Sequence, residues 1–215
     1  MRYSALLVML LASCGGPSTG PRPDGPPPEY PGALAAPATL TSPPALGDAF
    51  ALEQRVRTEY PDGEQEFRAV LERSGARMVL VGFGPHGGRG FVLSQTGAEV
   101  EFESHLPVEL PFPPEFMFHD IQRVWFRGLP GPLPDGEHRD EIDGEEIVER
   151  WEGGRLMERT FRRLSGEPAG TLRAIYEGGL GGEAPPEVVT WENAWFGYRL
   201  ILTTLSHQRI EPAEE

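Results

Sequence analysis

RVRTEYPDG, residues 55–63, joins a run of alternating apolar and charged side chains to a turn signal. Val56, Thr58 and Tyr60 point to one face of an extended chain, and the charged residues between them point to the other face. The Pro-Asp-Gly triplet that follows favours a tight change of direction. The stretch therefore predicts a β-hairpin with one buried face.

Strand patterns recur beyond this hairpin, separated by glycine-containing turns. They cover residues 67–72, 78–83, 91–93, 100–102, 145–151, 155–164, 171–176, 188–192 and 195–205. Residues 195–202 are apolar on both faces, which is typical of a central strand. We expect about ten strands joined largely by short hairpins, and a twisted sheet of that size curls rather than staying flat.

One amphipathic helix is expected between the two groups of strands, over residues 114–127. Prolines suit its first turn. Its apolar positions, at helical spacing, are Met117, Ile121, Val124 and Trp125. We expect His119 and Asp120 on its polar side. The predicted fold class is mainly β (α+β): a curved antiparallel sheet, or unclosed β-barrel, with the helix as a lid over its concave face.

The first fourteen residues read as an export signal that ends in a lipid attachment site. Residues 5–12 are apolar but too few to span a bilayer, which needs about 20 such residues. Leu11-Ala12-Ser13-Cys14 resembles the bacterial lipobox, which implies a lipid on Cys14 and cleavage before it. Gly15 then favours the outer membrane, by resemblance to known sorting signals. An ordinary signal peptide with an incidental cysteine is the alternative.

The chain divides into four expected parts. A lipoprotein signal peptide covers 1–13, and a Pro/Gly-rich disordered tether covers 14–45. The half-barrel domain covers 46–210, and an acidic tail covers 211–215. The lipid anchor would tie this protein to a membrane, so the expected location is the cell envelope, on the outer membrane facing the periplasm.

Composition argues against several function classes. The net charge of −14 repels nucleic acid, and the single cysteine leaves no disulfide framework. The five histidines lack metal-ligand spacing, and we identify no nucleophile. The loop at 82–87 matches a dinucleotide fingerprint in its glycines but leads into a strand, so we interpret it as a hairpin loop. The acidic run at 137–149 is interpreted as a solvated hairpin. We therefore assign no catalytic residue, no metal site and no cofactor.

The order of lipobox, tether, strands, Pro-rich helix and strands resembles an uncharacterised family of bacterial outer-membrane lipoproteins with a LolA/LolB-like fold. The stretches that carry the resemblance are Tyr60-Pro61-Asp62-Gly63-Glu64, Leu80-Val81-Gly82-Phe83-Gly84-Pro85 and Phe196-Gly197-Tyr198-Arg199-Leu200. The resemblance covers roughly residues 45–210. It implies an unclosed β-barrel with helices as a lid over an apolar cavity that receives acyl chains.

Our leading hypothesis is a non-enzymatic, lipid-anchored envelope protein that binds a hydrophobic ligand, such as an acyl chain or lipoprotein lipid. The candidate cavity or lid residues are Phe83, Phe116, Met117, Ile121, Val124 and Trp125. One alternative is a protein–protein interaction module with a packed core and an unknown partner. A second alternative is an envelope hydrolase with a site assembled across strands.

The lipid anchor can be tested directly. We expect Cys14→Ala to abolish both membrane fractionation and labelling with palmitate analogues, because the thiol is the group that takes the lipid. Labelling and fractionation of the bacterial host measure both effects. A variant that still carries the label would show that Cys14 is not the attachment site.

Overall fold

The computed structural model describes residues 39–61, 63–84, 86–105 and 112–210. Those residues form one antiparallel sheet of eleven strands and one α-helix, α1 (Glu115–Trp125), preceded by a short 3₁₀ helix, η1 (Pro43–Leu46). The strands are β1 (Phe50–Tyr60), β2 (Gly63–Ser74), β3 (Arg77–Phe83), β4 (Arg89–Thr96), β5 (Glu99–Ser104), β6 (Gly136–Ile142), β7 (Glu145–Glu152), β8 (Arg155–Arg163), β9 (Thr171–Leu180), β10 (Val188–Asn193) and β11 (Tyr198–Arg209).

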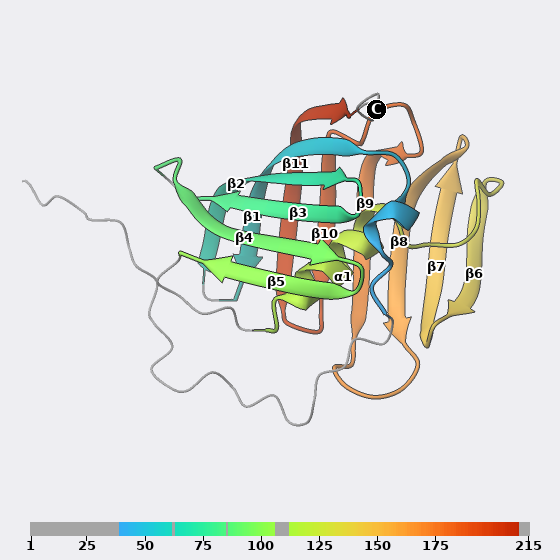
Figure 1. The fold of residues 1–215 in the computed structure, drawn as a ribbon. Coiled ribbons are helices and arrows are strands. Elements are labelled where there is room, and N and C mark those ends of the chain that lie inside the picture. Colours follow the sequence, from blue (N-terminus) through green and yellow to red (C-terminus); the bar gives the residue numbers. More distant parts are fainter. Residues whose placement is uncertain (1–38, 62, 85, 106–111, 211–215) are drawn as a thin grey trace, which may run out of the picture.

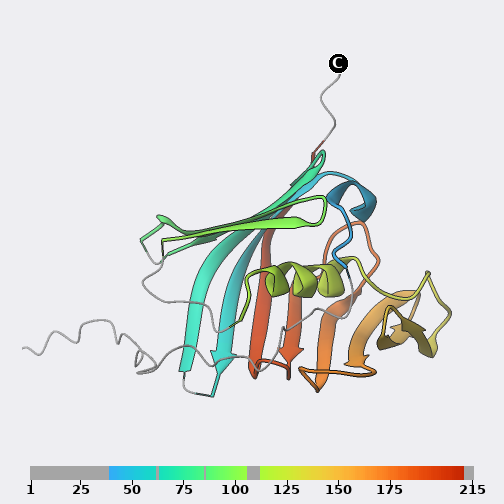
Figure 2. The same ribbon diagram turned by 60° about the horizontal axis from the view of Figure 1, so that its bottom comes forward.

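The strand order is β5-β4-β3-β2-β1-β11-β10-β9-β8-β7-β6, so the first and last strands pair at the centre. The chain runs outward from β1 to the edge strand β5, crosses by way of α1, and returns inward from the other edge strand, β6. The two edges do not pair, and the sheet curves around the helix (Figures 1 and 2). The predicted fold class is therefore confirmed: an unclosed antiparallel sheet with one helix against its concave face.

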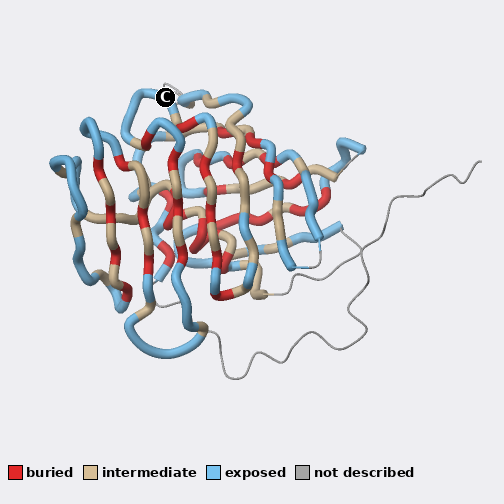
Figure 3. Tube along the Cα trace, turned by 180° about the vertical axis from the view of Figure 1, so that it is seen from behind, coloured by how far each residue is buried: buried red, intermediate tan, exposed pale blue. Residues whose placement is uncertain are grey.

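The concave face of the sheet holds most of the core. Residues in direct register share a face, and one apolar row crosses the first five strands. This row is Leu52, Leu71, Leu80, Leu93 and Phe102. Buried positions alternate with exposed ones along many strands, as Figure 3 shows. The alternation confirms the period-two pattern from which the strands were predicted.

The buried side chains form two clusters, one on each side of α1. The larger cluster lies mainly against β7–β11, extends to Val56 of β1 and Ala69 of β2, and includes Phe116 and Val124 from the helix. The smaller cluster lies against β1–β4 and consists of Leu40, Leu52, Leu71, Met78, Leu93 and Phe118. The helix thus separates two hydrophobic regions of one curved sheet.

The convex face carries rows of ion pairs between neighbouring strands. Arg173 of β9 reaches Glu158 of β8 at 2.7 Å, and Arg199 of β11 reaches Glu59 of β1 at 3.4 Å. Exposed pairs of this kind contribute little stability each, about 0–1 kcal/mol. They account for much of the charge on the strands without placing it in the core.

Three local expectations differ from the structure. The helix covers 115–125 rather than 114–127. Residues 195–197 form the turn between β10 and β11 instead of starting a central strand. Residues 39–45, expected in the tether, pack against the domain with Leu40 buried.

The signal peptide, Cys14, the rest of the tether and the acidic tail lie outside the described residues. Within the described ranges, the helices are too short and too polar to cross a membrane.

Gly82 of β3 should be irreplaceable because of close packing. A Cβ atom built there would lie 2.2 Å from Cε1 of Phe91, whose ring is buried on the neighbouring strand β4. We expect Gly82→Ala to lower the free energy of unfolding by about 1–3 kcal/mol, measured by urea denaturation. Gly88→Ala is the matched control, since nothing lies within 4 Å of its added Cβ. Equal stability of the two variants would contradict the close contact.

Candidate functional site

The candidate site is built around α1, whose two sides are attached differently to the sheet. Phe116 and Val124 are buried in the larger cluster. Met117, Ile121 and Trp125 follow at four-residue spacing, are half-buried, and pack against the smaller cluster on β1–β4. The predicted apolar helix positions therefore divide between two faces rather than forming one wall.

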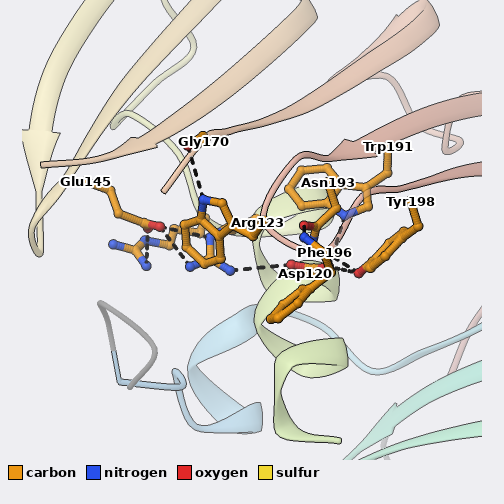
Figure 4. Close-up of polar contacts among 10 residues, drawn as sticks. Asp120, Arg123, Glu145, Gly170, Trp191, Asn193, Phe196 and Tyr198 are labelled. Carbon is orange, nitrogen blue, oxygen red and sulfur yellow. Dashed lines mark hydrogen bonds and ion pairs between the residues drawn. The ribbon is translucent and has the colours of Figure 1, made fainter. Parts of the chain in front are cut away.

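Asp120 fixes the helix to β10 and β11. Three donors reach one carboxylate oxygen: the indole of Trp191 at 3.0 Å, the amide of Asn193 at 2.9 Å and the hydroxyl of Tyr198 (Figure 4). Burial raises the pKa of Asp120, while Arg123 and the three donors act in the opposite direction. The expectation that Asp120 lies on a polar, solvent-facing side of the helix is wrong, because its side chain is 6% exposed.

Arg123 fixes the helix to β7. Its guanidinium is fully buried and donates to Oε1 of Glu145 at 2.8 and 3.2 Å. It also lies 4.9 Å from the ring centroid of Trp195. Arg127 reaches the other oxygen of Glu145 at 2.9 Å. Removing one partner of such a pair leaves an uncompensated buried charge, which costs several kcal/mol.

The C-terminal end of α1 is capped by side chains from β8 and β9. Arg159 donates to the carbonyl of Arg123 at 3.1 Å, and the Tyr176 hydroxyl donates to the carbonyl of Val124 at 2.6 Å. Glu149 holds Arg159 in place by accepting from its Nε at 2.6 Å. Side chains from one half of the sheet therefore satisfy these carbonyls, which are left without partners at the end of the helix.

The acidic run at 137–149 does form a hairpin, β6–β7, but it is not wholly solvated. Glu145 and Glu149 are fully buried. Strand alternation could have indicated this, because both glutamates share the parity of Ile147 and Trp151, which are also buried. Similarly, Asp120 and Arg123 share the helical face of Phe116 and are buried with it.

Toward β1–β5, α1 is held through Gln122. Its amide donates to Oε1 of Gln95 on β4 at 3.1 Å and exchanges two 2.9 Å hydrogen bonds with the backbone of Thr41. Around these groups the surfaces are apolar: Met117, Ile121 and Trp125 on the helix face the smaller cluster. We call this contact zone the α1/β1–β5 interface.

Phe83 lies apart from this interface. It pairs with Arg68 of β2, whose guanidinium carbon sits 5.1 Å from its ring centroid, on the face opposite Leu52 and Leu71. Phe83 is therefore on the convex face. The other five predicted lid residues all belong to α1 and line one or other side of the helix.

Two open surface pockets lie on the described part of the chain, and neither lies between α1 and the sheet. One, of about 380 Å³, is lined by Tyr60, Asn193, Tyr198 and neighbouring residues at the ends of β1, β10 and β11. The other, of about 480 Å³, is lined by Glu183, His207 and Arg209. The α1/β1–β5 interface is occupied by side chains, Leu40 among them.

His119 should make the folded chain sensitive to acid. Burial, with the charges of Arg123 and Arg127, lowers its pKa from 6.5 to about 3. Below pH 6.5 the unfolded chain therefore binds a proton that the folded chain does not, and the free energy of unfolding falls as pH drops toward 3.

Over this pH range His119 contributes about 1.4 kcal/mol per pH unit to the slope of the free energy of unfolding against pH, and we expect His119→Gln to remove that contribution. Denaturant unfolding between pH 7 and about pH 4 measures the difference between variant and wild type. His86→Gln, at an exposed position, serves as control and keeps the wild-type slope. An unchanged slope in His119→Gln would show that His119 is protonated in the fold.

Comparison with known proteins finds similar solved structures and one matching family. No curated protein matches the chain. Among solved structures, it is similar to a LolA superfamily protein from Nitrosomonas europaea, with 18% identity and a TM-score of 0.44 over 77% of this chain and 87% of that one. It is also similar to a domain named as an outer membrane lipoprotein-sorting protein domain from Vibrio parahaemolyticus, with 12% identity and a TM-score of 0.49 over 79% and 88%.

The family described as "Protein of unknown function (DUF3261)" matches residues 51–206, which span β1 to most of β11. The match covers well over half of the chain and includes α1 with its buried partners on β7–β11. The chain therefore belongs to the DUF3261 family.

Proposed function

We propose that this protein is a lipid-anchored, non-enzymatic protein of the cell envelope, attached through Cys14 to the outer membrane on its periplasmic side. It binds a hydrophobic ligand, an acyl chain or the lipid of a lipoprotein, at the α1/β1–β5 interface. The observation that carries this proposal is the unequal attachment of α1. Buried ionic and polar bonds fix it to β7–β11, whereas mainly apolar surfaces meet on its other side.

The chemistry of that interface suits an acyl chain. Its two walls carry mainly aliphatic, thioether and aromatic side chains, beside the buried polar groups of Gln122 and Gln95, and several of the apolar side chains remain half-buried. These partly buried residues are Phe50, Leu80, Val100, Phe102, Met117, Ile121, Trp125 and Phe126. Completing the burial of such surface stabilises a complex by about 25 cal/mol per Å². Ligand sites of this class are mainly apolar with few polar groups.

One polar group on the same face has no hydrogen-bond partner among the residues that the structure describes. Nε2 of Gln54, on β1 between Leu52 and Val56, is buried without a hydrogen bond. A buried donor of this kind gains by meeting an acceptor. The carbonyl oxygen of an acyl ester or acid supplies one, which supports a ligand that combines an apolar chain with a carbonyl group.

The ionisable groups around α1 support a binding role. Asp120 accepts from Trp191 and two further donors, Glu145 forms ion pairs with Arg123 and Arg127, and both carboxylates hold the helix in place. The rigid part of the site is thus the β7–β11 side. A ligand enters by separating α1 from β1–β5, where fewer polar bonds oppose it.

Ligand binding can be measured with cis-parinaric acid, a naturally fluorescent fatty acid. We expect the Cys14→Ala chain to bind it, and we expect Ile121→Gln in that background to bind roughly tenfold more weakly, because an amide is left uncompensated in an apolar site. Val79→Gln is the matched control and keeps the affinity, since Val79 is half-buried on the convex face.

Native mass spectrometry of the same purified chain gives a second readout. Lipid that co-purifies supports the proposal. A clean apo mass together with no response to cis-parinaric acid would overturn it, and would favour an interaction module with a packed core.

A further inference from the structure

The segment of residues 39–48, which we call the strap, closes the α1/β1–β5 interface. Its backbone is held by three buried polar side chains that come from both walls: Gln122 from α1, Gln95 from β4 and Arg73 from β2. Thr41 exchanges hydrogen bonds of 2.9 Å with Gln122, and its carbonyl also accepts from Gln95 at 2.9 Å. The strap therefore bridges the helix and the sheet.

Arg73 secures the next part of the strap. Its Nη1 donates to the carbonyl of Pro43 at 3.1 Å and its Nε donates to the carbonyl of Asp48 at 2.8 Å. All these bonds go to backbone atoms of the strap. These bonds hold the strap in position whatever its side chains are. The side chain that lies between the two walls is therefore selected by its packing and not by the hydrogen bonds.

That inserted side chain is Leu40. It is 8% exposed and belongs to the smaller cluster with Leu52, Leu71, Met78, Leu93 and Phe118. Of these six, five come from the walls of the domain, on β1–β4 and α1, and Leu40 alone comes from the strap. A branched apolar side chain inserted between an apolar sheet and helix presents the same kind of surface to these walls as a short piece of acyl chain.

We propose that Leu40 occupies the subsite that receives part of the hydrophobic ligand, and that the strap leaves the interface when the ligand binds. This inference rests on the proposed function and adds to it the position of one subsite and the segment that guards it. Ligand and strap compete for the same apolar walls, so the apparent affinity for ligand is reduced by the fraction of molecules whose strap is closed.

Two of the three polar side chains that hold the strap, Gln122 and Gln95, keep partners after it leaves, whereas Arg73 loses its hydrogen bonds to the carbonyls of Pro43 and Asp48. Gln122 and Gln95 remain hydrogen-bonded to each other at 3.1 Å, and Gln95 also donates to the carbonyl of Gly97 at 2.7 Å. The cost of leaving polar groups unsatisfied is thereby reduced for the two glutamines, and the bonds of Arg73 are the main polar interaction that opposes release of the strap. The strap also precedes β1 directly and continues toward Cys14, so its release lengthens the connection between anchor and domain.

The first test weakens the strap and measures binding of cis-parinaric acid to the Cys14→Ala chain. We expect Leu40→Ala to bind the probe roughly tenfold more tightly than its parent, since truncating a buried leucine shifts the strap toward the open state. Thr39→Ala is the matched control: it alters the exposed neighbour in the same strap and leaves the affinity unchanged.

The second test needs no variant of the strap. In hydrogen exchange of the Cys14→Ala chain, we expect peptides covering residues 39–46 to exchange faster when cis-parinaric acid is bound, because the Thr41 amide loses its acceptor on Gln122. Peptides from β9 and β10, on the rigid side of α1, provide the internal reference and do not lose protection.

The outcomes separate the two proposals. Binding of the probe with an unchanged affinity in Leu40→Ala, or with a strap that stays protected, overturns the role of the strap and leaves the proposed function standing. Absence of binding in both the parent and Leu40→Ala overturns the proposed function itself. Tighter binding together with faster exchange of the strap supports both.

Discussion

The fully buried ion pair between Arg123 and Glu145 is the constraint on which the rest of the structure depends. The Arg123 guanidinium is fully buried, and Glu145 and Asp120 compensate its charge from β7 and from α1 itself. Asp120 is fixed in turn by donors on β10 and β11. The helix that crosses from one sheet edge to the other therefore has one allowed position and orientation against β7–β11.

This anchoring makes the two sides of α1 unequal. On one side, charged and hydrogen-bonded groups make separation costly, since any movement leaves buried charges without partners. On the other side, apolar packing and backbone contacts with the strap close the structure. A hydrophobic ligand that enters there replaces apolar contacts within the protein by apolar contacts with itself. The attachment that fixes the helix to β7–β11 therefore also determines that the α1/β1–β5 interface is the one able to open. The curved sheet supplies the matching wall because its concave face carries an unbroken apolar row from β1 to β5.

Sequence reasoning succeeded where a single local period controls the outcome. Alternation of apolar and charged residues identified the hairpins, and the helical spacing of Met117, Ile121 and Trp125 located α1 to within two residues. It failed for Asp120 and for the acidic run, because charged residues were taken to face solvent. Strand alternation did indicate the face on which these glutamates lie, because Glu145 and Glu149 share a face with Ile147. A charged residue on the buried face of a strand enters the core only if a partner of opposite charge meets it there. The arginine that compensates Glu145 lies 22 residues away in sequence, so local alternation alone does not identify it.

The sequence by itself determined the class of fold and the position of the helix between two groups of strands. Only the tertiary structure decided that the first and last strands pair at the centre, that Phe83 faces outward, and that Leu40 enters the core ahead of the expected domain boundary. The physical reason is the range of the interactions. Periodicity is set by neighbours along the chain, whereas burial of a charge or a strap residue is set by groups that only folding brings together.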